Sequence, residues 1–67
     1  MDFTIYASEL RALGVDPRKW SSLPQSQKQG YAGAILRARG NAQATAAAHL
    51  IESNNPNALQ RLQLVWN

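Results

Sequence analysis

The chain has 67 residues, no cysteine, seven Lys or Arg residues against four Asp or Glu residues, and a hydrophobic fraction of 45%. Its length allows one domain over residues 1–67, and the lack of cysteine excludes disulfides and thiolate metal sites. No apolar run approaches the roughly 18 residues of a membrane span and no signal peptide is visible, so we expect a cytoplasmic protein without a membrane partner.

A first helix is predicted to end at Gly14. Phe3, Tyr6, Leu10 and Leu13 recur at the spacing of one helix face, so they are expected to point toward the core. Glycine readily adopts the left-handed conformation that closes many helices, and Gly14 is placed to do so.

A short second helix is predicted to start at Asp16 and Pro17. Asp16 can accept a hydrogen bond as the N-cap, and proline is favoured at the first helical position. This helix holds Trp20 and Leu23, and it should end before Pro24 because proline breaks a helix interior.

A third helix is predicted to run to about Arg39. Ser22 and Gln25 have the spacing of a capping box, which would start this helix. Tyr31 and Ile35 mark its apolar face.

A fourth helix is predicted after Gly40 and Asn41, where glycine closes the third helix and asparagine caps the next one. Its many alanines give high helix propensity and permit close packing. The residues expected to face the core are Ala47, Leu50 and Ile51.

A fifth helix is predicted after the turn at residues 54–56, with Asn55 and Pro56 as its capping pair. Its buried stripe would consist of Leu59, Leu62, Val65 and Trp66.

No segment has the alternation of β-branched and polar residues that is typical of a strand. The sequence therefore predicts an all-α fold: a single compact domain of four to five short helices with Gly/Asn/Pro-capped turns. The core is expected to include Trp20, Tyr31, Ile35, Leu50 and Leu62.

The positive charge is concentrated in the middle of the chain. Residues 17–51 hold five cations and no acid, although the net charge is only +3. Such a segment can contact phosphates or an acidic protein, and a mild imbalance without a function is the alternative. The candidate nucleic-acid- or partner-binding residues are Arg18, Lys19, Lys28, Arg37 and Arg39.

The stretch Ser8–Trp20 loosely resembles the opening of helix-turn-helix DNA-binding domains. In those families a helix ends in Leu-Gly-Val, here Leu13–Val15, and a capped second helix enters the major groove. The resemblance implies that Arg18 and Lys19 lie at the groove-facing start of a recognition helix. An ordinary capped helix pair is the alternative interpretation.

Two glycines share one side of the third helix. With Tyr31 turned inward, Gly30, Gly33 and Arg37 fall together on the opposite side. Glycine in a helix interior costs about 1 kcal/mol relative to alanine, so the pair needs a reason. Gly30 and Gly33 could form a partner-helix face. Without side chains there, another helix or a phosphodiester chain could come close to the backbone of this helix. Packing against the alanine-rich helix of the same chain, or a kink, are the alternatives.

Leu64 lies away from the apolar stripe of the fifth helix. It could be an isolated exposed leucine, or it could join Trp66 in a dimer or partner surface. A homodimer is therefore one of the assemblies left open by the sequence.

The chain is poor in catalytic groups. His49 is the only imidazole and falls opposite Ala47 and Leu50 on a helical wheel, so we expect it in solvent. One histidine without acids or cysteines at ligand spacing does not indicate a metal site. We therefore expect a non-enzymatic protein with no catalytic residue, no metal, no cofactor and no small-molecule substrate.

Two functions follow from these features. The first is a small prokaryotic, phage or plasmid regulator that binds nucleic acid through the basic central segment. The alternative is an adaptor or inhibitor that presents a helix face to one protein partner. One contiguous basic face would favour nucleic acid, whereas dispersed cations with an exposed apolar patch would favour a protein partner.

Overall fold

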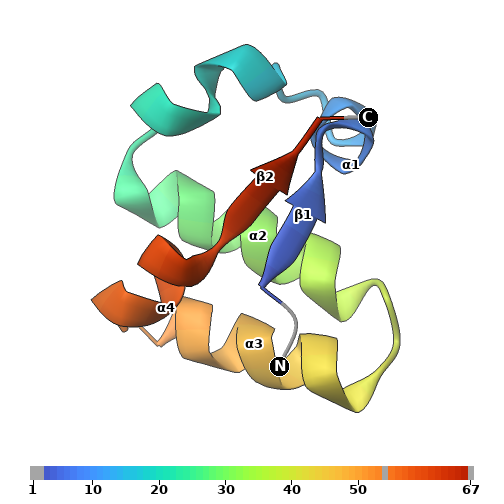
Figure 1. Cartoon of the computed structure of the whole chain (residues 1–67), viewed down its shortest axis with the longest axis vertical. Coiled ribbons are helices and arrows are strands. Elements are labelled where there is room, and N and C mark those ends of the chain that lie inside the picture. The colour runs from blue at the N-terminus through green and yellow to red at the C-terminus, as the bar shows by residue number, and fades with distance from the viewer. Residues whose placement is uncertain (1–2, 54, 67) are drawn as a thin grey trace.

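Short helices make up most of the computed structural model, which describes residues 3–53 and 55–66. This result confirms that the chain forms a compact, mostly helical globule, although the predicted fold was all-α. Asn54, which was expected to help end the fourth helix, lies outside the described residues. The elements in chain order are β1 (Thr4–Tyr6), α1 (Ala7–Ala12), the 3₁₀ helix η1 (Pro17–Ser22), α2 (Gln25–Arg37), α3 (Ala42–Glu52), α4 (Pro56–Arg61) and β2 (Gln63–Val65) (Figure 1).

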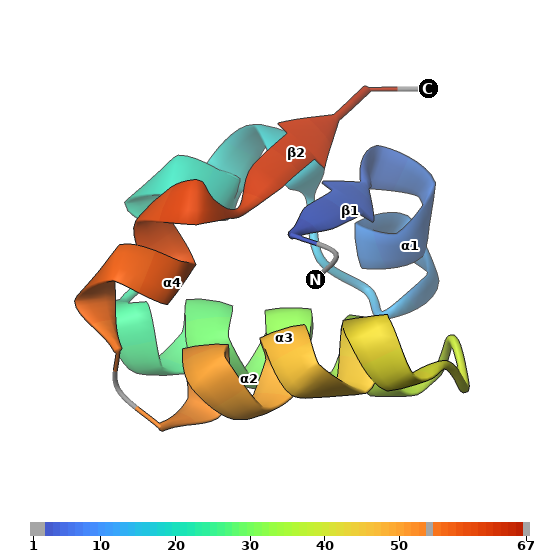
Figure 2. The same cartoon turned by 60° about the horizontal axis from the view of Figure 1, so that its bottom comes forward.

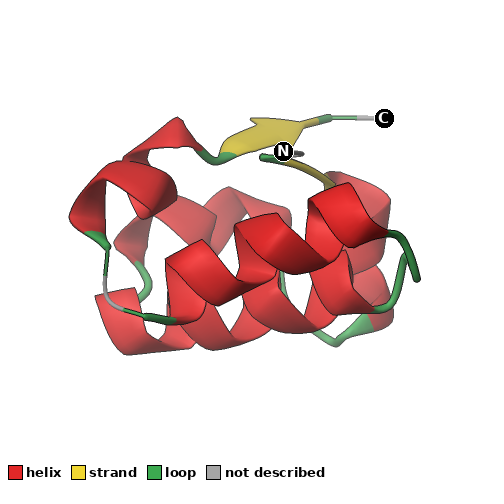
Figure 3. Ribbon diagram, turned by 90° about the horizontal axis from the view of Figure 1, so that it is seen from below, coloured by secondary structure: helices red, strands yellow, loops and turns green. Residues whose placement is uncertain are grey.

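The antiparallel helices α2 and α3 form the base of the molecule and share its most extensive helix contact (Figure 2). The two strands lie together on one side of this helix pair (Figure 3). They run parallel, with Thr4 opposite Gln63 and Tyr6 opposite Val65. The first and last elements of the fold are therefore neighbours in space.

The prediction that the chain has no strands is wrong at both ends of the fold. Ile5 is fully buried and Leu64 packs against the core, whereas Tyr6 and Val65 are exposed on the other face of the sheet. This is the alternation of a strand, but each strand has only three residues. Such a short alternation is easily mistaken for part of a helix face.

The strands also shorten the first and last predicted helices. α1 begins only at Ala7, and Tyr6 and Leu13, which were expected in its buried face, are exposed. α4 ends at Arg61, so Val65 and Trp66 do not continue a buried helical stripe.

The turn after α1 has the hydrogen bonds of a Schellman motif. Gly14 has a φ of 80°, and its N–H donates to the Arg11 carbonyl at 3.0 Å. The Val15 N–H donates to the Leu10 carbonyl at 2.9 Å. Asp16 then accepts the Arg18 N–H at 3.0 Å and starts η1.

The predicted capping box at Ser22 is wrong. α2 begins at Gln25, directly after Pro24, because the chain is extended at Leu23 and Pro24. The Ser22 hydroxyl instead donates to the Lys19 carbonyl at 2.8 Å, within η1.

Asparagine side chains cap the two following helices. Asn41 Oδ1 accepts the Ala44 N–H at 2.7 Å, and Asn55 Oδ1 accepts the Asn57 N–H at 3.1 Å. These bonds satisfy backbone donors that the first turn of a helix leaves without a helical partner.

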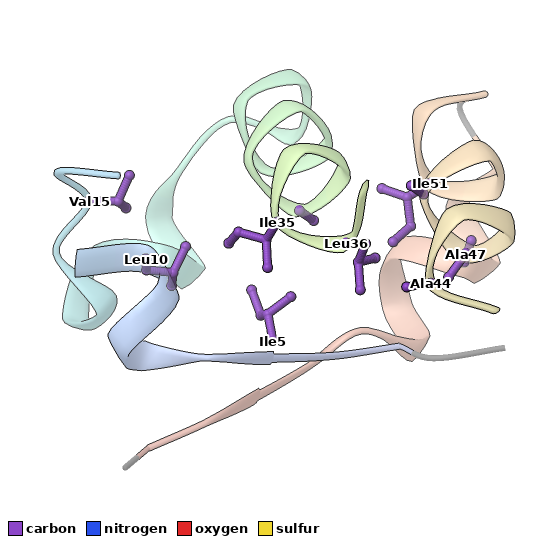
Figure 4. Close-up of a cluster of buried hydrophobic side chains, with 11 residues drawn as sticks. Ile5, Leu10, Val15, Ile35, Leu36, Ala44, Ala47 and Ile51 are labelled. Atoms are coloured by element: carbon purple, nitrogen blue, oxygen red, sulfur yellow. The ribbon is translucent and has the colours of Figure 1, made fainter. Parts of the chain in front are cut away.

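The core lies between β1, α1, α2 and α3 (Figure 4). Its largest fully buried side chains are Ile5, Leu10, Leu36 and Ile51. Ile35 is buried as predicted, and the other expected core residues are half-buried and pack against the cluster: Trp20, Tyr31, Leu50 and Leu62. The buried alanines of α3 are Ala44, Ala47 and Ala48, and their small size allows α2 and α3 to approach closely.

Candidate functional site

Arg18, the first of the five predicted binding cations, is paired within its own turn. Its guanidinium Nη2 lies 3.3 Å from Asp16 Oδ2, while its N–H bonds the same carboxylate. These bonds from Arg18 hold the pKa of Asp16 below its ordinary value. Arg18 is also part of a six-residue 3₁₀ helix that ends before Pro24. The second helix of the segment that resembles a helix-turn-helix opening is therefore very short, with only six residues.

Arg37 joins α2 to α3. Its Nε–H donates to Glu52 Oε1 at 3.1 Å, and its Nη2 makes a second bond to the same oxygen. This pairing holds the pKa of the Glu52 carboxyl below its ordinary value. Both side chains remain partly exposed to water, so the pair stabilises the fold only modestly.

Arg39 joins the end of α2 to α1. Its Nη2 lies 2.7 Å from Glu9 Oε1, and only 17% of its side chain is exposed. Glu9 Oε1 also accepts the Tyr6 N–H at 2.9 Å, and the Arg39 guanidinium lies 5.8 Å from the centre of the Tyr6 ring. Arg39 thus has a cation–π contact as well as an ion pair.

The two predicted lysines have different surroundings. Lys19 is exposed on η1, and Lys28 is half-buried in the first turns of α2. Lys28 lines a pocket of about 230 Å³ with Gln25, Leu59 and Gln60. Within the described part of the chain, neither lysine has a carboxylate at ion-pair distance.

The five cations are thus spread over three places: η1, the start of α2 and the end of α2. Arg37 faces Glu52 of α3, whereas Arg39 faces Glu9 of α1. The fold does not bring the five charges together in one cluster.

The two predicted glycines of the partner-helix face have different neighbours. Gly33 is buried, and a Cβ added there would lie 2.8 Å from Glu52 Cδ and 2.9 Å from Glu52 Cγ. Gly30 is exposed, with nothing within 4 Å of an added Cβ. Gly33 therefore makes room for a side chain of α3, and Gly30 faces open space.

We expect Gly30→Ala to raise the free energy of unfolding by about 1 kcal/mol, because alanine is the better helix former and its methyl group meets nothing. Gly33→Ala should raise the free energy of unfolding by less, since its methyl group would displace Glu52 from Arg37. Urea unfolding followed by circular dichroism measures both effects. Equal gains at the two positions would contradict the packing at Gly33.

The Glu52 carboxylate should also make stability depend on pH. Its folded pKa lies below the ordinary value of 4.5, so the unfolded chain takes up the proton first as the pH falls. The free energy of unfolding should therefore decrease on acidification through and below that value. Urea midpoints at about pH 7 and about pH 3 should differ less in Glu52→Gln than in the wild type. Identical pH profiles would show that the pair with Arg37 does not stabilise the fold.

Exposed apolar side chains stand at the end of the sheet, although the sequence interpretation placed them in buried helix faces. Tyr6 is 39% exposed, its strand neighbour Val65 38%, and the following Trp66 58%. We call these three residues the sheet patch. The local signal for it is an alternation over residues 4–6 and 63–65, where Ile5 and Leu64 alternate with outward-facing side chains, and this signal is too short to be read from the sequence alone.

A second apolar surface lies between α1 and α2. It is a groove of about 220 Å³, and Leu13, which is 46% exposed, stands at its wall. The other lining residues are Glu9, Ala12, Ala34, Ile35 and Ala38.

The described residues show no arrangement typical of a metal centre. His49 is exposed on α3, and no three His, Asp or Glu side chains gather at metal-binding distance in residues 3–53 and 55–66. None of the helices in this part of the chain has the length and apolar character needed to cross a membrane. Comparisons of the chain with protein-family models, curated proteins and solved structures find no match.

Proposed function

We propose that this protein is a small, non-enzymatic protein-binding module whose contact surface is the sheet patch. The observation that carries the proposal is the exposure of the strand neighbours Tyr6 and Val65, and of Trp66, which follows Val65 in the chain. Tyrosine and tryptophan are enriched at protein interfaces, where a few such side chains supply most of the binding energy.

Contacts with two neighbouring residues hold Tyr6 of the sheet patch in place. Tyr6 is fixed by its N–H bond to Glu9 and by the Arg39 guanidinium above its ring. Side chains that are already ordered lose less entropy on binding, so this arrangement favours a specific contact.

The distribution of charge favours a protein over nucleic acid as the partner. Three of the five predicted cations, Arg18, Arg37 and Arg39, each bind a carboxylate of the same chain. An arginine that is paired in this way has to give up its carboxylate, or share it, in order to contact a phosphate. The spread of the cations over three places and the exposed apolar patch support a protein partner.

Trp66→Ser tests this proposal. A tagged wild-type protein should capture a discrete partner from the cells that produce it, and Trp66→Ser should lose most of that capture. Leu13→Ser is the matched control, because it removes another exposed large apolar side chain, which lies outside the sheet patch. Equal capture by both variants would assign binding to another surface.

Nucleic-acid binding is the second candidate, and the two lysines without a described carboxylate favour it. If Lys19 and Lys28 contact phosphates, log K for duplex DNA should fall with log salt with a slope of about −2. Lys19→Gln combined with Lys28→Gln should remove that dependence. No binding to mixed-sequence DNA at low salt would end this candidate.

A further inference from the structure

We propose that the pocket between α2 and α4 binds a carboxylate that is joined to a short apolar chain. Lys28 of α2 would pair with the carboxylate, and Leu59 of α4 would contact the apolar chain. The carboxylate can belong to a free small molecule or to a side chain of the partner protein, and these two sources are distinguished by partner capture. The pocket shares no residue with the sheet patch, so the site does not depend on the proposed function.

The pocket has room for such a ligand. α4 lies beside the start of α2 (Figures 1 and 2), and the space between them is lined by Gln25, Lys28, Leu59 and Gln60. Its volume is about 230 Å³, which is below the roughly 300–1,000 Å³ of pockets for drug-sized ligands. The ligand, or the part of it that enters the pocket, is therefore small.

Lys28 carries a positive charge that the described part of the chain does not neutralise. Residues 3–53 and 55–66 contain three carboxylates, and each of them already bonds an arginine: Glu9 bonds Arg39, Asp16 bonds Arg18, and Glu52 bonds Arg37. Lys28 is half-buried, whereas Lys19 is exposed. Opposite charges attract more strongly where contact with water is reduced, so an anion from outside should gain more at Lys28 than at Lys19.

Two amide side chains complete a polar set that suits a carboxylate. Gln25 and Gln60 each have an NH₂ group that can donate hydrogen bonds, and nothing in the described residues bonds either amide. A carboxylate can accept a charge-assisted bond from Lys28 and further bonds from these amides. One cation with two neutral donors matches a single negative charge better than the nearly double charge of a phosphate monoester.

Leu59 gives the pocket an apolar side. It is half-buried and packs against the core, so its position is fixed by the fold. A hydrocarbon chain next to the carboxylate would remove apolar surface of Leu59 from water, which favours binding. Inorganic phosphate has no such chain, and Leu59 therefore favours an organic carboxylate over phosphate.

Titration with butyrate at constant ionic strength, followed by ¹H–¹⁵N NMR, tests the site. The side-chain amide signals of Gln25 and Gln60 should shift and saturate at millimolar butyrate, whereas the signal of Gln43 on α3 should stay in place. Acetate lacks most of the apolar chain, and butanamide lacks the charge. Both should bind about threefold or more weakly than butyrate, and inorganic phosphate should also bind more weakly.

Lys28→Gln should weaken butyrate binding about tenfold or more, because it removes the charge that pairs with the carboxylate and keeps a long polar side chain. Lys19→Gln is the matched control, since it removes the same charge from η1, outside the pocket. Leu59→Ala should bind butyrate and acetate equally. This comparison of two ligands within one variant does not depend on how stable the variant is.

Partner capture distinguishes the two sources of the carboxylate. If Lys28→Gln captures less partner than Lys19→Gln does, and saturating butyrate also lowers capture by the wild type, the carboxylate belongs to the partner protein. If both variants capture the partner as the wild type does, the pocket takes a free organic carboxylate.

Three results would overturn the inference: no saturable shift with butyrate, equal binding of butyrate by Lys28→Gln and the wild type, or tighter binding of phosphate than of butyrate. The last result would assign Lys28 to phosphates, as the nucleic-acid candidate expects. None of them decides the proposed function, which depends on the loss of partner capture in Trp66→Ser.

Discussion

Replacing Leu36 with alanine should lower the free energy of unfolding by about 2–5 kcal/mol. Leu36 is fully buried on α2, in the same cluster as Ile5 of β1 and Ile51 of α3 (Figure 4). The shorter side chain would leave a cavity where these elements meet. Whole domains are typically stable by about 5–15 kcal/mol, so this loss can leave a chain of 67 residues partly unfolded. Urea unfolding monitored by circular dichroism gives the difference.

Leu13→Ala is the matched control for Leu36→Ala. It removes the same atoms from a leucine that is 46% exposed, and its effect should stay within about 0.5 kcal/mol. Similar losses in the two variants would contradict the position of α2 in the core.

The turns of the fold could be predicted because their signals are local. Gly14, Asp16 and Asn41 each bond a backbone group two or three residues away, so a short window of sequence contains each cap and the group that it bonds. The start of α3 follows from the same kind of signal.

The sheet could not be predicted in this way because its two halves lie at opposite ends of the chain. Each strand is stabilised by the other, and neither one has enough residues to establish a period of two. Tyr6, Leu10 and Leu13 also happen to have helical spacing, which favoured a helix over the segment that forms β1. Tertiary pairing decided the structure of this segment against its local pattern.

The candidate site could be predicted only in part for a similar reason. Residues 17–51 contain no acid, and the basic segment is therefore plain in the sequence. The carboxylates that bind Arg37 and Arg39 come from outside this segment, Glu52 from just after it and Glu9 from before it. Only the fold reveals that these charges are partly neutralised, and only the sheet places Tyr6 beside Val65.

Gln63→Pro should lower the free energy of unfolding by about 1–3 kcal/mol, because it removes a backbone donor and leaves the Phe3 carbonyl without its partner. That bond is 2.7 Å long and stands at the start of the pairing between β1 and β2. Gln63→Ala is the matched control: it keeps the N–H and changes only an exposed side chain, so stability should change by about 0.5 kcal/mol or less. Urea unfolding of the two variants measures the difference, and equal stabilities would show that the sheet contributes little to the fold.

The same pair of variants connects the sheet to the proposed function. Tyr6 and Val65 are neighbours only because β1 and β2 are paired, so Gln63→Pro should lose partner capture under conditions in which circular dichroism shows its helices intact. Gln63→Ala should capture the partner as the wild type does. Undiminished capture by Gln63→Pro would mean that the partner contacts the helices, and the groove between α1 and α2 that Leu13 lines would then be the surface to alter next.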